Sequence, residues 1–221
     1  MRLRAGWLLA VLALAACTVP ARKSTAPPAP PPAGSVAQLC AIIDADARKS
    51  DHETDPHARA ALAADSRRAA DACLAQAPQA VACVFGDALA LGLEAREHPA
   101  HALATLNDML ATLARAEAID AAYADAGPAR VQALVLTRAP GWPLGPGDPE
   151  RAVAAAQRAV ALRPAYPPNW LALAEAQSKA GSAADAQASF ARARDAARAF
   201  SESPERAQWL SEAEQHLGSS S

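Results

Sequence analysis

From Ser35 onward, apolar and alanine positions recur at helical spacing, and no segment alternates apolar and polar residues as a half-buried strand does. Val36, Leu39 and Ile43 mark a first helix, which the polar residues 49–55 end. A proline in the first helical position needs no N–H donor, so later helices are predicted to begin at prolines. These are Pro56, Pro78, Pro99, Pro128, Pro149 and Pro204. The pattern predicts an all-α chain.

The C-terminal half contains a repeat of two helices. The tetratricopeptide repeat, about 34 residues long, has large, small and proline residues at fixed positions. With Trp170 at position 4, the required residue types follow at Leu173, Ala174, Gly181, Ala186, Phe190 and Ala193. The second half of a preceding repeat is matched by Gly147, Ala152, Ala159 and Pro164. We expect a right-handed superhelical stack of tetratricopeptide-like helix hairpins, with one clear repeat and others degenerate.

A loop of about ten residues interrupts this pattern. The segment APGWPLGPGD, Ala139 to Asp148, holds three prolines and three glycines, so it cannot continue a helix. Helix hairpins usually use loops of about 2–5 residues. Two interpretations remain: a stiff connector with Trp142 filling a gap, or a loop that lines a binding surface or passage.

The N-terminus is typical of a bacterial lipoprotein. Residues 1–16 combine a basic start, Arg2 and Arg4, with a short apolar run, as a signal peptide does. Cys17 follows two alanines, which resembles the lipobox, and is the expected lipid attachment site, the palmitate-type anchor of such proteins. Residues 17–34 are then the lipidated cysteine and a Pro/Ala-rich tether, residues 35–218 the helical domain, and residues 219–221 a disordered tail. Thr18 is not the aspartate that typically retains lipoproteins in the inner membrane, so the periplasmic face of the outer membrane is expected.

Three cysteines remain after Cys17. If one helix ends near Ala77 and the next begins at Pro78, Cys73 and Cys83 lie opposite each other across the turn. This position predicts a disulfide between them and leaves Cys40 unpaired. The alternative is three buried thiols acting as small apolar side chains.

Charge and motifs exclude several functions. The net charge is −2, and removing the signal lowers it by two, so nucleic acid is not an expected partner. Residues 51–57, DHETDPH, fit a solvated turn better than a metal site. The sequence has no nucleophile motif and no glycine-rich phosphate loop. We therefore expect no catalytic residue, no metal and no cofactor.

One stretch resembles a narrower family. Residues 127–176 contain Gly-Pro followed by Arg130, the loop APGWP, the pair Gly147-Asp148, and Tyr166-Pro167 with Asn169. They resemble the T component (TatT) of tripartite ATP-independent periplasmic (TRAP) transporters, lipoproteins built from cryptic tetratricopeptide repeats. The resemblance implies an α-helical periplasmic lipoprotein that partners a periplasmic solute-binding protein. It also implies a homotrimer with a passage for a hydrophobic solute through each protomer.

The candidate partner- or ligand-binding residues all lie in that stretch: Arg130, Gly141, Trp142, Pro143, Tyr166, Asn169 and Trp170. Tyr166 and Asn169, next to prolines, are expected to be surface contacts. Trp170 fits a core position as well as a contact, and Arg130 fits a surface ion pair as well as an acidic partner group. The alternative function is a scaffold lipoprotein for outer-membrane or pilus assembly, which would use the concave surface of the repeats.

Overall fold

The computed structural model describes residues 32–200 and 203–218, and all its described helices lie in one compact unit, Pro31–Ser221. Nine helices and no strand occur in these residues. In chain order they are α1 (Val36–His52), α2 (Pro56–Gln76), α3 (Val81–Glu97), α4 (Ala102–Ile119), α5 (Tyr123–Arg138), α6 (Pro149–Leu162), α7 (Pro167–Lys179), α8 (Ala183–Ala199) and α9 (Arg206–Gly218). None of the described helices is long and apolar enough to cross a membrane. Cys17, the expected lipid attachment site, and the segments expected to be the signal peptide and the C-terminal tail lie outside the described residues.

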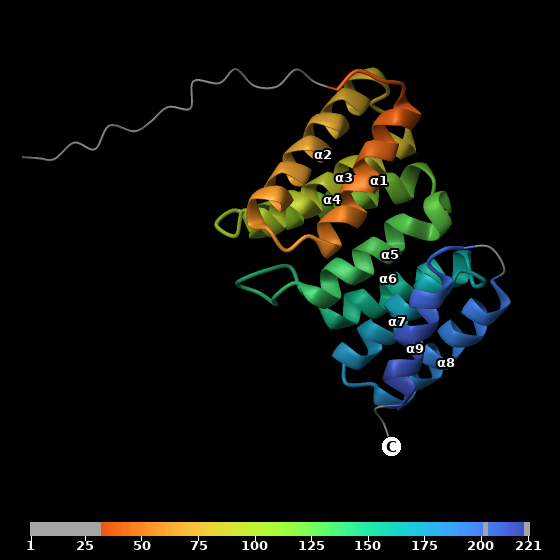
Figure 1. Cartoon of the computed structure of the whole chain (residues 1–221). Helices are drawn as coiled ribbons and strands as arrows, with labels where there is room; N and C mark the ends of the chain where they lie inside the picture. Colours follow the sequence, from red (N-terminus) through yellow and green to blue (C-terminus); the bar gives the residue numbers. More distant parts are fainter. Residues whose placement is uncertain (1–31, 201–202, 219–221) are drawn as a thin grey trace, which may run out of the picture. The chain divides into compact units, whose positions relative to one another are not determined.

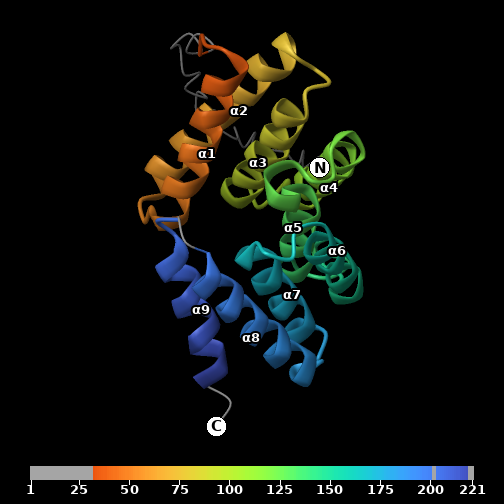
Figure 2. The same ribbon diagram turned by 90° about the vertical axis from the view of Figure 1, so that its right-hand side faces the viewer.

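Consecutive helices pack as hairpins, and the hairpins stack (Figures 1 and 2). The pairs are α1 with α2, α3 with α4, α5 with α6, and α7 with α8, and α9 packs against α8. The first helix of each pair also contacts the first helix of the next, from α1 through α3, α5 and α7 to α9. Because every hairpin buries a face against its neighbours, the stack shares a continuous core. The predicted fold class, a stack of tetratricopeptide-like hairpins, is confirmed.

Alanine makes this close stacking possible. Where α5, α6 and α7 meet, the buried side chains include Ala133, Ala155 and Ala156, beside Leu173. A methyl group lets two helix backbones approach closely and loses no rotamer freedom on burial. The larger apolar side chains gather in three other clusters: around Leu39 and Ile43 where α1 to α3 meet, around Phe85 and Leu113 between α3 and α4, and around Phe190 between α7 and α8.

The α7–α8 hairpin has the features expected of the clear repeat. Ala174 of α7 and Ala186 and Phe190 of α8 are buried in one cluster, while Leu173 is buried against α5 and α6. At the end of α7, Gly181 adopts φ +81°, a conformation that costs glycine little. The Ser182 N–H donates to Gln177 O at 2.9 Å and the Gly181 N–H to Ser178 O at 3.1 Å, the Schellman arrangement that ends a helix.

Only some prolines open helices in the way the sequence predicted. Pro56 and Pro149 occupy the first helical positions of α2 and α6, as expected. In contrast, α3, α4 and α9 begin two or three residues after Pro78, Pro99 and Pro204. Each of these prolines is the second residue of a four-residue turn closed by a backbone hydrogen bond, such as Ala80 N–H to Ala77 O at 3.1 Å. Proline's fixed φ suits that turn position as well as the helix start, which is why the spacing alone did not separate them.

Cys73 of α2 and Cys83 of α3 form a disulfide across the α2–α3 turn, with their Cα atoms 5.3 Å apart. This is the pair expected from the turn position. Both residues are fully buried, while Cys40 is a free, partly buried thiol.

Candidate functional site

The ten-residue loop between α5 and α6 stands out from the helices around it (Figure 1). Its two ends are held together, because Gly147 N–H donates to Pro140 O at 2.8 Å and Asp148 N–H donates to Leu136 O at 2.9 Å. A side chain on Gly147 would clash with the carbonyl oxygen of Ala139, so glycine is needed there. The loop is therefore closed at its base by backbone contacts, and the Trp142–Pro143 peptide bond within it is cis.

The tip of this loop presents two large apolar side chains to solvent. Trp142 is 89% exposed and Leu144 is 78% exposed. The interpretation in which Trp142 fills a gap in the core is therefore wrong. Trp142 borders a hollow of about 560 Å³ between the loop and α4, together with Leu103 and Leu110. Gly141 and Pro143, the other predicted contacts in the loop, are exposed beside it.

A second cavity, also about 560 Å³, lies where α1, α3, α4 and α5 meet. Its wall is mostly apolar and includes Leu89, Leu93, Leu106, Met109, Val131, Leu134 and Val135. Ala139, the first residue of the loop, also borders it, so the loop begins at the rim of the cavity. Arg96, Arg138 and Asp51 are the charged residues of the rim. Sequence reasoning missed this cavity, since its wall combines residues of four helices that individually look like ordinary core positions.

Arg130, Tyr166 and Asn169, which the sequence singled out, do come together, but inside the fold. Asn169 is fully buried, so the expectation that it is a surface contact is wrong. Its side-chain amide nitrogen lies 3.0–3.2 Å from three carbonyl oxygens, of Asp125, Ala159 and Arg163. Its side-chain oxygen accepts a hydrogen bond of 3.0 Å from Arg130 Nη1. One amide thus ties α5, α6 and α7 together.

The Arg130 guanidinium completes this cluster. It donates to the carbonyl oxygens of Asp125 at 2.8 Å and Ala124 at 3.2 Å, and it lies 5.0 Å from the centre of the Tyr166 ring. Burial lowers the pKa of Arg130 below its ordinary value. The charges of Tyr166 and Asp125 raise the pKa and so oppose this effect in part. Arg130 is partly exposed, but its hydrogen bonds go to backbone carbonyls and to Asn169 and not to a carboxylate, so its contacts are those of a residue that holds the structure together.

The segment that Arg130 holds has an unusual backbone. Ala124, Asp125 and Ala126 all lie in the left-handed region, with φ of 49°, 54° and 60°. For residues other than glycine this conformation costs roughly 1–2 kcal/mol each. The right-handed part of α5 therefore begins at Gly127-Pro128, where the sequence predicted a helix start.

Because of this backbone, substitution of Ala124 by glycine should stabilise the protein, whereas glycine within a helix usually destabilises it. Ala124→Gly should raise the free energy of unfolding by about 0.5 kcal/mol, because relief of the left-handed strain exceeds the added entropy of the unfolded chain. The same change at Ala188, exposed within α8, should lower it by about 1 kcal/mol. Urea unfolding of both variants measures the two signs. Equal destabilisation by both changes would contradict a strained left-handed segment.

Tyr166 and Trp170 are half-buried in the same region. The Tyr166 ring packs edge-on against Phe200 and Trp209. Trp170 Nε1 donates to Pro164 O at 2.7 Å, and its ring packs against buried residues of α6 to α8. Of the two interpretations of Trp170, its contacts match the core position of the repeat.

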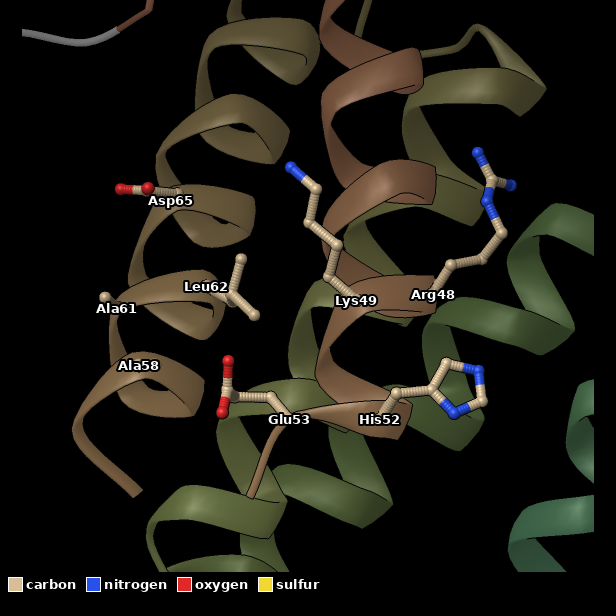
Figure 3. Close-up of a pocket in the computed structure, with 8 residues that line it drawn as sticks. All are labelled: Arg48, Lys49, His52, Glu53, Ala58, Ala61, Leu62 and Asp65. Atoms are coloured by element: carbon tan, nitrogen blue, oxygen red, sulfur yellow. The ribbon is translucent and has the colours of Figure 1, made fainter. Parts of the chain in front are cut away.

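A shallow groove of about 630 Å³ runs between α1 and α2 (Figure 3). Lys49 extends from α1 between the two helices, while the Arg48 and His52 side chains point away from α2. Ala58, Ala61 and Leu62 form the α2 wall. Among the described residues, no group of three or more His, Cys, Asp or Glu side chains is placed to hold a metal ion. The groove offers mixed charge without converging polar atoms, so it is a weaker candidate than the loop and its adjoining cavity.

Comparison with known proteins agrees with the stacked hairpins. Residues 144–205, which include the end of the loop and α6 to α8, match the tetratricopeptide repeat family model. Residues 144–205 are thus a tetratricopeptide-type helical repeat within the stack of hairpins, and tetratricopeptide proteins generally bind protein partners. No curated protein matches the chain significantly.

Five chains of known structure match it, among them the following two. A thermophilic tetratricopeptide-repeat protein of Thermus thermophilus aligns with a TM-score of 0.55 at 21% identity, covering 82% of this chain and 95% of the other. At that identity the likeness concerns the fold. A crystal structure of MamA protein aligns over 76% of this chain and 100% of the other, with 15% identity and a TM-score of 0.38, too low to bear on the fold.

Proposed function

We propose that the protein is a lipid-anchored periplasmic accessory component of a TRAP-type uptake system. In this proposal it binds the periplasmic solute-binding protein of that system and holds or guides a hydrophobic solute. The membrane contact is the lipid on Cys17, and the assembly is a homotrimer, as the resemblance of residues 127–176 implies. The protein carries out no reaction of its own.

One observation carries this proposal: an apolar cavity of about 560 Å³ opens beside the loop that bears the resemblance. Ligand pockets are commonly 300–1,000 Å³, mostly apolar, with few polar groups. A tetratricopeptide scaffold that only presents a surface needs no such cavity. The exposed Trp142 at the tip of the loop supports the second half of the proposal, since tryptophan is enriched among residues that dominate protein interfaces.

The cavity can be tested by filling it. Ala47 lies on α1 at the cavity wall, and Ala47→Phe should weaken binding of the neutral fluorescent probe 1-aminoanthracene at least tenfold, because the ring occupies the probe's volume. Ala61→Phe, in the groove between α1 and α2, is the matched control and should leave probe binding unchanged. Fluorescence titration measures both affinities. Equal loss in both variants, or no binding to the unaltered chain, would contradict a solute site in this cavity.

The scaffold hypothesis predicts a different result. A scaffold lipoprotein for outer-membrane or pilus assembly would not bind the probe, and it would co-purify from detergent-solubilised membranes with assembly machinery. A transporter component should instead co-purify with a periplasmic solute-binding protein. Quantitative mass spectrometry of the recovered proteins distinguishes the two.

A further inference from the structure

The three cysteines of the helical domain meet at one point, although each belongs to a different helix. Cys40 lies on α1, Cys73 on α2 and Cys83 on α3. The Cys40 Sγ atom is 3.8 Å from the Cys73 Sγ atom, which is already bonded to Cys83. The free thiol therefore touches the disulfide, and Cys73 is the sulfur between the other two. Nothing in the solute cavity or the loop involves these residues.

Such a triad has the parts needed for thiol–disulfide exchange. A thiolate attacks one sulfur of a disulfide and displaces the other, so it must lie against the sulfur it attacks and the leaving thiolate must be stabilised. Cys40 meets the first condition through its 3.8 Å contact. Cys83 meets the second, because it is the third residue of α3, where the helix N-terminus favours a thiolate.

We propose that Cys40 is a second disulfide partner of Cys73, and that the bridge exchanges between Cys73–Cys83 and Cys40–Cys73. In the exchange, the Cys40 thiol loses its proton to water and the thiolate attacks Cys73 Sγ. The Cys40–Cys73 bond forms as the Cys73–Cys83 bond breaks, and Cys83 leaves as a thiolate that takes up a proton. One disulfide and one thiol are present before and after, so no oxidant or reductant is consumed.

The exchange changes which helices are tied together. The Cys73–Cys83 bridge links α2 to α3 across a short turn, whereas a Cys40–Cys73 bridge links α1 to α2. Burial, and secondarily the charge of Asp44, raise the pKa of the Cys40 thiol, which keeps this residue protonated in the resting protein. Exchange is therefore slow at neutral pH, and Cys73–Cys83 is the resting bridge.

Removing Cys83 tests whether Cys40 and Cys73 can pair. In the full-length chain, Cys83→Ser should form a Cys40–Cys73 disulfide on mild oxidation with diamide, so both residues should lose their reactivity toward N-ethylmaleimide. Tryptic digestion should then show the peptide containing Cys40 cross-linked to the peptide containing Cys73. The control Cys73→Ser should keep Cys40 and Cys83 reactive under the same treatment. Circular dichroism checks that each variant keeps its helices.

The unaltered chain gives a second measurement that needs no substitution in the bridge. The helical domain carries one free thiol, so each domain takes up one label, which then blocks further exchange. After incubation for hours without added thiol or oxidant, a short pulse of N-ethylmaleimide should label most chains at Cys40 and a minor fraction at Cys83. Cys40→Ser is the control and should never label at Cys83. Cleavage after Leu74 separates the two bridge cysteines for mass spectrometry. Label confined to Cys40, a folded Cys83→Ser chain that keeps both thiols, or a Cys40–Cys83 cross-link in Cys73→Ser would each overturn the proposal.

Discussion

Replacing Asn169 with alanine should lower the free energy of unfolding by about 4 kcal/mol. The side chain is fully buried and lies within hydrogen-bond distance of three backbone carbonyl oxygens, while its own oxygen accepts from Arg130. Each buried polar group that loses its partner costs about 1–3 kcal/mol, and a hydrogen bond to a charged group is at the upper end of that range. For a domain of this size the melting temperature should fall by about 10 °C. Urea unfolding followed by circular dichroism measures the change.

The matched control for this prediction is Asn107→Ala. Asn107 is exposed on α4, and its loss should change the free energy of unfolding by less than about 0.5 kcal/mol. If Asn169→Ala proved as mild as Asn107→Ala, the amide would not be the tie between α5, α6 and α7. A loss of partner binding with unchanged stability would return Asn169 to the role of a surface contact that the sequence suggested.

If the proposed function holds, replacing Trp142 with alanine should weaken binding to the solute-binding protein about 30-fold without a measurable loss of stability. The side chain is 89% exposed, so its removal leaves no cavity in the core, and surface substitutions usually change stability by less than about 0.5 kcal/mol. An interface tryptophan that dominates binding contributes about 2 kcal/mol or more, which corresponds to a factor of about 30. Isothermal titration of the purified chain with a periplasmic solute-binding protein, the partner class of the proposed function, measures the affinity.

Ile119→Ala controls for the loss of any exposed apolar side chain. Ile119 is 41% exposed at the end of α4, away from the α5–α6 loop in the sequence, and its removal should leave the affinity unchanged. A lower melting temperature with intact binding in Trp142→Ala would show that the loop is a connector only. Equal weakening by both substitutions would indicate that binding depends on general hydrophobicity and not on the loop.

The sequence predicted the position of the Trp142 side chain better than that of Asn169. The proline-glycine composition of the loop excluded a helix, and Trp142 stood out as a large side chain in an insertion; its exposure agrees with a contact role. Asn169 stood out through the same family-like stretch, yet the sequence could not reveal which way its side chain points. Burial of an amide requires several backbone carbonyls to converge on it, and here they come from segments 6, 10 and 44 residues away.

The left-handed segment before α5 shows the same limit. Ala124, Asp125 and Ala126 carry none of the glycine signals that usually mark such a backbone, and alanine normally favours a right-handed helix. The carbonyl oxygens of the first two accept hydrogen bonds from Arg130, six and five residues further along α5, and the Asp125 carbonyl also accepts one from Asn169 of α7. A local sequence pattern does not reveal a conformation that depends in part on a residue of another hairpin, here Asn169.

By itself the sequence determined the helical class, the repeat in α7 and α8, the position of the loop and the pairing expected for Cys73 and Cys83. These features depend on contacts between residues near one another in the chain: helical periodicity, turn residues and the spacing of one hairpin. Only the tertiary structure decided that Asn169 is buried, that Cys40 touches the disulfide, and that four helices enclose an apolar cavity beside the loop. Those features depend on how hairpins are placed against one another, and alanine-rich faces with similar periodicity leave that placement open until the whole stack is assembled.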